Sequence, residues 1–142
     1  MKKKVLISSC LLGVNCRYDG GNNKLPEEKL NELKEKYELI PVCAECYGGL
    51  TTPRVPSERR NGRVYSKTGT DVTAEFEKGA GAALYLAELF GAELAILKEN
   101  SPSCGSGTIY DGTFSGTLTD GDGVTAELLK KHGITVIGEK MI

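Results

Sequence analysis

The sequence predicts an α/β fold: a three-layer domain with a mainly parallel, twisted sheet of about four to five strands and helices on both faces, of the Rossmann or flavodoxin-like type. Short apolar runs alternate along the chain with longer segments of helical periodicity, which is the order expected of βαβ units. The runs VLI, LAIL and TVI are not interrupted by polar residues, which is typical of strands that a parallel sheet buries on both faces.

The first half of the chain contains two expected strands and one expected helix. Residues 4–8 (KVLIS) form the first apolar run, and residues 38–43 (ELIPVC) form the second. Between them, residues 25–37 place Leu30 and Leu33 at helical spacing. We therefore expect a strand, a helix and a second strand in this order.

The second half repeats this alternation. Residues 71–90 carry apolar or small side chains along one helical face, and Gly91 follows as a stop signal. Residues 92–100 (AELAILKEN) contain the third expected strand, residues 123–133 a short helix, and residues 134–139 (ITVIGE) the final strand.

Two irregular stretches are long for plain connections, so we expect them to be lids or binding loops. Residues 105–123 are rich in glycine, and Asp111-Gly112 can turn a hairpin there. Residues 51–70 carry a basic set that can follow RNA phosphates, but Glu58 interrupts it, so a solvated or site-closing loop is favoured. The members of this set are Arg54, Arg59, Arg60, Arg63 and Lys67.

Length and composition indicate one globular domain over residues 1–142. The formal net charge of −1 excludes a global basic field for nucleic acid. The apolar run after the basic start is too short for a signal peptide, and no run approaches the roughly 18 residues of a membrane span. We therefore expect a cytoplasmic protein, in which the five cysteines are thiols, metal ligands or catalytic groups.

Three cysteines follow three different expected strands: Cys10, Cys43 and Cys104. Ligands of open parallel sheets bind beyond the carboxyl ends of the strands, so these thiols are expected at one edge and predict a shared metal site. Thiolates select zinc, copper(I) or iron–sulfur clusters. The chain has a single C-x-x-C, and its lone histidine, His132, is expected to cap a helix, so a cluster or metal with one open site fits best.

Other interpretations of these residues remain open. The cysteines can belong to a non-catalytic zinc- or thiol-binding domain, or Cys43 and Cys46 can form a thiol-redox pair. Against the redox pair, the following YGGLTTPRVP is not expected to start a helix. Glu45 can act as an acid or base beside the metal, or it can be an ordinary salt-bridge partner.

Three segments, SSCLLGVNCRYDG, PVCAECYGGLTTPRVPSE and LKENSPSCGSGTIYDGTFSG, resemble in order and spacing the TudS-type thiouracil desulfidase family, long grouped as domain of unknown function 523. The resemblance covers nearly the whole chain. It implies a 4Fe-4S cluster held by Cys10, Cys43 and Cys104, with an open iron for the thiocarbonyl sulfur. It also implies catalytic roles for Glu45 and Ser101.

The implied reaction is a non-redox desulfuration of thiouracil-like bases to uracil and hydrosulfide, with a small thiolated pyrimidine rather than RNA as substrate. This chain departs from the family motif C-P-E, because Ala44 replaces the proline. Cys16 and Cys46 are less expected as ligands. The residues that we expect to line or brace the substrate pocket are Cys16, Arg17, Tyr18, Asp19 and Ser103.

Overall fold

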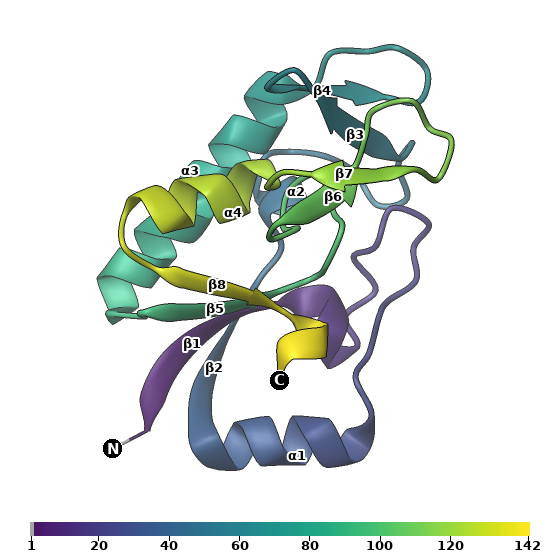
Figure 1. The fold of residues 1–142 in the computed structure, drawn as a ribbon. Helices are drawn as coiled ribbons and strands as arrows, with labels where there is room; N and C mark the ends of the chain where they lie inside the picture. The colour runs from purple at the N-terminus through teal and green to yellow at the C-terminus, as the bar shows by residue number, and fades with distance from the viewer. Residues whose placement is uncertain (1) are drawn as a thin grey trace.

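A computed structural model describes residues 2–142 and contains a four-stranded parallel sheet with the order β2-β1-β5-β8 (Figure 1). Its strands are β1 (Lys3–Ser8), β2 (Tyr37–Val42), β5 (Leu94–Leu97) and β8 (Thr135–Gly138). All four coincide with apolar runs in the sequence. The predicted α/β class is confirmed.

Helices cover both faces of this sheet (Figure 1). Helix α1 (Glu27–Lys36) packs on one face through Leu33, while α3 (Thr73–Phe90) and α4 (Val124–Lys131) pack on the other through Ala87 and Leu129. Short helical turns follow three of the strands: η1 (Ser9–Leu12), α2 (Ala44–Tyr47) and η2 (Glu139–Met141). The molecule therefore has the three expected layers.

Neighbouring side chains of the central strands enter different cores. Leu6 packs on the α3 and α4 side, whereas Val5 and Ile7, on either side of it, pack on the α1 side, and all three are fully buried. Because both faces are covered by helices, neither set of side chains can be polar. This explains the uninterrupted apolar runs in the sequence.

Two hairpins lie above the carboxyl edge of the sheet, and one of them was not expected. The segment 51–70, predicted to be irregular, contains β3 (Ser57–Arg60) and β4 (Arg63–Ser66) as an antiparallel pair. Their turn is Asn61-Gly62, and both residues have positive φ, as a type I′ hairpin requires. This dipeptide was the available signal for the hairpin.

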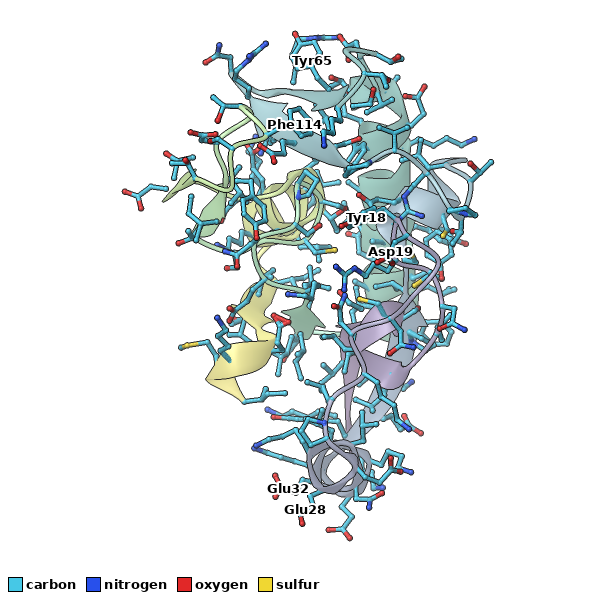
Figure 2. All side chains as sticks on the ribbon, turned by 90° about the vertical axis from the view of Figure 1, so that its right-hand side faces the viewer. Tyr18, Asp19, Glu28, Glu32, Tyr65 and Phe114 are labelled. Atoms are coloured by element: carbon cyan, nitrogen blue, oxygen red, sulfur yellow. The ribbon has the colours of Figure 1, made fainter. Side chains whose placement is uncertain are left out.

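The second hairpin was expected and is present. It pairs β6 (Thr108–Tyr110) with β7 (Leu118–Asp120). Its loop is longer than the Asp111-Gly112 turn, because the second strand begins only at Leu118. Figure 2 shows the hairpin residues Tyr65 and Phe114 at one end of the molecule, and Glu28 and Glu32 on α1 at the other.

Helix α2 lies against α3 with almost no side chains between the two backbones. A Cβ atom on Gly79 would overlap the carbonyl oxygen of Ala44, and one on Gly48 would overlap that of Glu75. The two glycines therefore allow the backbones to approach closely. This contact sets the position of the turn that carries Cys43 and Glu45.

We expect Gly79→Ala to lower the free energy of unfolding by about 1–3 kcal/mol, because the new methyl group overpacks this contact. The loss should be measurable in urea denaturation although alanine is the better helix former by about 1 kcal/mol. Gly81→Ala is the matched control, since a Cβ atom added there would meet nothing within 4 Å and the residue is exposed in the same helix. Equal stability of the two variants would contradict the proposed close contact.

Candidate metal and substrate site

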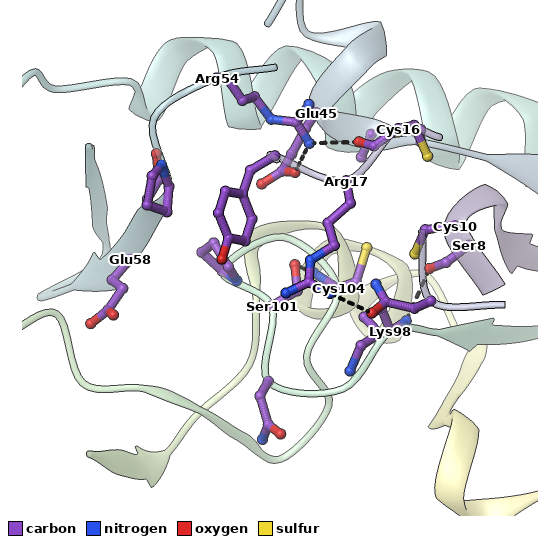
Figure 3. A pocket seen from close by; sticks show the side chains of 18 of the residues that line it. Ser8, Cys10, Cys16, Arg17, Glu45, Arg54, Glu58, Lys98, Ser101 and Cys104 are labelled. Atoms are coloured by element: carbon purple, nitrogen blue, oxygen red, sulfur yellow. Dashed lines mark hydrogen bonds and ion pairs between the residues drawn. The ribbon is translucent and has the colours of Figure 1, made fainter. Parts of the chain in front are cut away.

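A cavity of about 540 Å³ opens at the carboxyl edge of the sheet, between the loops at the strand ends and the two hairpins (Figure 3). Counting only the strands of this sheet, their order 2-1-3-4 places a topological switch point beside β1, where open α/β sheets bind ligands. The loops that follow β1, β2 and β5 all contribute residues to the cavity wall.

The cavity brings together the thiols that the sequence placed at three strand ends. Cys10 lies in η1 after β1, Cys43 precedes α2 after β2, and Cys104 lies in the loop after β5. Cys16 also lines the cavity, whereas Cys46 does not. All five cysteines are free thiols.

Backbone hydrogen bonds hold the loop that carries Cys10 and Cys16. Gly13 turns the chain with φ of 100°, a conformation that favours glycine. The backbone N–H of Asn23 then donates to the carbonyl oxygen of Cys10 at 2.9 Å, so the loop returns to its starting point. Gly13 is therefore the turn residue of this loop.

Hydroxyl groups organise the loop that carries Cys104. Ser101 Oγ accepts hydrogen bonds from the backbone N–H groups of Ser103 and Cys104, each at 3.1 Å. Ser8 Oγ accepts from the backbone N–H of Lys98 at 2.9 Å and so joins the ends of β1 and β5 (Figure 3). The Cys104 loop is thereby held beside the Cys10 loop.

Burial keeps these thiols in their neutral form. It raises the pKa of Cys10, Cys16 and Cys43, and it raises the pKa of Cys104 to about 12, where the nearby Glu45 acts in the same direction. Buried thiolates need a compensating cation, and soft sulfur donors suit iron in a sulfide cluster. The donor set therefore fits an iron–sulfur cluster. Within residues 2–142, no three Cys, His, Asp or Glu side chains are arranged to hold a single metal ion.

Glu45 and Arg54 form a shielded ion pair in the cavity wall. Arg54 Nη2 donates to Glu45 Oε2 at 2.5 Å, and the two side chains are 8% and 21% exposed for Arg54 and Glu45 respectively. The same nitrogen donates to the carbonyl oxygen of Cys16 at 3.0 Å (Figure 3). The backbone N–H of Arg54 donates to the carbonyl oxygen of Tyr18 at 2.7 Å. Arg54 thus connects the loop of Cys16 with the turn of Glu45.

Sequence patterns placed Arg54 only in a basic loop and did not reveal this pair. The two residues lie nine positions apart on separate segments, and no spacing rule links them. Sequence reasoning also missed Lys98 and Tyr110, which line the cavity just after β5 and in the second hairpin.

The residues expected around the substrate differ in whether they line the cavity. Tyr18 and Arg17 line the cavity, and Arg17 Nη1 donates to Asn23 Oδ1 at 3.3 Å. Asp19 lies outside the cavity wall, where it pairs with Arg17 Nε at 3.5 Å and braces the loop. Ser103 is fully buried, and its hydroxyl is hydrogen-bonded to that of Thr125 at 2.8 Å. It therefore does not line the cavity, contrary to the expectation from the sequence.

The segment after Cys43 contains a short helix that the sequence did not predict. Residues Ala44–Tyr47 do form a short helix, and Cys43 is its N-cap, because the glycines that were expected to prevent a helix follow it instead. The expectation that YGGLTTPRVP starts no helix is confirmed, but the helix that precedes it leaves Cys43 at a helix N-terminus, so this expectation does not exclude a redox pair. Burial nevertheless raises the pKa of Cys43, the reverse of the lowered pKa typical of the catalytic nucleophile of a thiol-disulfide oxidoreductase. His132 is the C-cap of α4, as expected.

Fold and cavity together define a small α/β protein that gathers partly buried thiols and a carboxylate at a strand-end site suited to a metal cluster. The chain belongs to the 2-thiouracil desulfurase family, whose model matches residues 5–141. This confirms the resemblance found in the sequence.

Two relatives span nearly the whole chain. A solved structure described as the [4Fe-4S]-dependent thiouracil desulfidase TudS (DUF523Vcz) superposes with a TM-score of 0.95 at 45% identity, covering 99% of this chain and 93% of that one. The uncharacterized protein YbbK of Bacillus subtilis (strain 168) is 43% identical over 145 residues, which is 95% of each chain. None of the helices within residues 2–142 is long and apolar enough to cross a membrane.

Proposed function

We propose that this protein is an iron–sulfur-dependent desulfidase that converts thiouracil-like thiolated pyrimidines to uracil and hydrosulfide without net electron transfer. The observation that carries the proposal is the convergence of Cys10, Cys43 and Cys104 on one cavity that also contains Glu45. The family and the similarity to a [4Fe-4S]-dependent thiouracil desulfidase support it. Residues 1–142 would then act as one cluster-binding domain.

We assign Cys10, Cys43 and Cys104 as the cluster ligands, because each belongs to a different strand end and all three line the cavity. When bound, a 4Fe-4S cluster with three protein ligands supplies a thiophilic Lewis acid that makes a thiocarbonyl carbon more electrophilic. The remaining chemistry falls to the residues of this chain.

Glu45 is assigned as the general acid–base group. Arg54 binds its Oε2, which leaves Oε1 to accept or donate a proton in the cavity. A carboxylate at this place can activate water or protonate the departing pyrimidine. Because Arg54 is itself held by the Cys16 carbonyl oxygen, it fixes the direction of the Glu45 side chain.

Ser101 and Tyr18 are assigned to substrate positioning. The oxygen of Ser101 already accepts two backbone N–H groups, so its hydroxyl hydrogen can be donated to a pyrimidine or to the attacking water. Tyr18 lines the mouth of the cavity and is 39% exposed, so its ring offers a flat apolar surface to a planar base.

The substrate is assigned as a small molecule rather than RNA. Three arginines of the basic segment 51–70 are engaged in ion pairs, which reduces the charge available for phosphates. These pairs are Arg54–Glu45, Arg59–Glu127 and Arg63–Asp71. We also place the protein in the cytoplasm, because five free thiols suit a reducing compartment.

An anaerobic assay with 2-thiouracil and 4-thiouracil tests the proposed function. Reconstituted protein is expected to release hydrosulfide and uracil in equal amounts without an added reductant. Protein treated with an iron chelator should release neither product. Absence of release from both substrates, or release that survives chelation, would overturn the proposal.

A further inference from the structure

Cys46 contacts the proposed ligand Cys43 without lining the cavity. The Cys43 thiol donates to Cys46 Sγ at 3.3 Å, and Thr52 Oγ1 lies 3.7 Å from Cys46 Sγ on the other side. Both cysteines are partly exposed. Nothing in the proposed reaction uses the Cys46 thiol.

The sulfur atoms of the two cysteines lie close to disulfide-bonding distance. Cys43 is the N-cap of α2, and Cys46 belongs to the same helical turn. This turn packs tightly against α3, because Gly48 on one side and Gly79 on the other allow the two backbones to approach closely. A disulfide has an S–S bond of about 2.05 Å, so side-chain rotation has to bring the sulfur atoms closer by only about 1 Å. Cys16 also lies near Cys43, but it belongs to a different loop.

We propose that Cys43 and Cys46 form a site of reversible oxidation that competes with cluster binding. In protein without a cluster, a peroxide or a low-molecular-weight disulfide oxidises the pair. The two thiols lose two protons and two electrons and form one S–S bond, while hydrogen peroxide is reduced to two waters, or glutathione disulfide to two thiols.

In the disulfide, the sulfur atom of Cys43 is bonded to Cys46 and is no longer free to bind the cluster. Cys43 cannot then provide a thiolate to iron, so assembly waits until a thiol reductant opens the bond. Cys46 thereby protects Cys43 from further oxidation to sulfinic acid, which thiols do not reverse. This consequence rests on the proposed ligand role of Cys43, whereas formation of the disulfide itself does not.

Mass spectrometry of oxidised apoprotein tests the site. Trypsin releases residues 37–54 as one peptide that contains both Cys43 and Cys46, because no Lys or Arg lies between Lys36 and Arg54. After treatment with hydrogen peroxide, this peptide is expected to lose two hydrogens and the protein two titratable thiols. Iron and sulfide should then fail to restore the cluster absorbance until dithiothreitol is added.

Cys46→Ser and Cys16→Ser are the matched variants. The Cys16→Ser protein should still form the disulfide within residues 37–54, whereas the Cys46→Ser protein should not, and its cluster uptake should be lost irreversibly after peroxide. A cross-link between Cys16 and Cys43, or recovery of Cys46→Ser equal to that of the unchanged protein, would overturn the site. Disulfide formation with unimpaired cluster assembly would overturn the competition, and with it the ligand role of Cys43, independently of any activity.

Discussion

The Glu45→Gln variant is expected to lose about 10²–10⁴-fold in kcat for thiouracil desulfuration, the range typical of removing a general acid–base group. The amide is nearly isosteric with the carboxyl group and can still accept the hydrogen bond from Arg54, so the turn of α2 should stay in place. Cluster absorbance should therefore equal that of the unchanged protein. The measurement is anaerobic hydrosulfide release under saturating substrate, normalised to bound iron.

Glu58 provides the matched carboxylate control for this result. It lines the same cavity, but its Oε1 accepts the backbone N–H groups of Gly112 and Phe114 at 3.0 and 3.1 Å and so supports the hairpin loop. Glu58→Gln should lower kcat by no more than about tenfold, the effect of weakening one or two hydrogen bonds. Equal losses in the Glu45 and Glu58 variants, or full turnover of Glu45→Gln with an intact cluster, would refute the assigned role.

Replacing Cys104 by Ser is expected to remove both the cluster and the activity. A serine hydroxyl has nearly the same size as the thiol, but it is a hard donor that rarely replaces thiolate on iron. The buried loop should persist, because Ser101 binds the backbone rather than the side chain of residue 104. We expect less iron per chain, loss of the visible absorbance after anaerobic reconstitution, and hydrosulfide release at the background rate.

Variants of two other cysteines in this region distinguish the cluster ligands from neighbouring thiols. Cys46→Ser should retain iron and activity, since Cys46 lies outside the cavity wall. Cys16→Ser should also retain iron, although Cys16 lines the cavity and lies near Cys43. Full iron content in Cys104→Ser together with its loss in Cys16→Ser would replace Cys104 by Cys16 in the ligand set.

The parallel sheet and its three layers could be predicted because their signals are local. Uninterrupted apolar runs such as Val5–Ile7 follow from burial on both faces, and helical periodicity in residues 71–90 follows from burial on one. The hairpin of β3 and β4 was missed because Arg59, Arg60 and Arg63 gave the segment the composition of a solvated loop. Only the Asn61-Gly62 turn carried its signal.

Placement of the thiols could also be predicted, since strand order and strand direction are enough to bring Cys10, Cys43 and Cys104 to one edge. The orientation of individual side chains could not. Ser103 and Ser101 are two residues apart, yet one is buried against Thr125 and the other lies in the cavity wall. Backbone turns in a loop decide such differences, and they follow no fixed period.

The fold class, the sheet edge where the thiols gather and the family could all be predicted without the structure, because periodicity, residue type and motif order are properties of the chain. Two contacts emerge only in the folded chain: Arg54 holds Glu45, and Cys46 contacts Cys43 from outside the cavity. These contacts depend on how closely α2 approaches α3 and on how separate loops meet above the sheet. Long-range packing sets both, and no pattern of neighbouring residues encodes them.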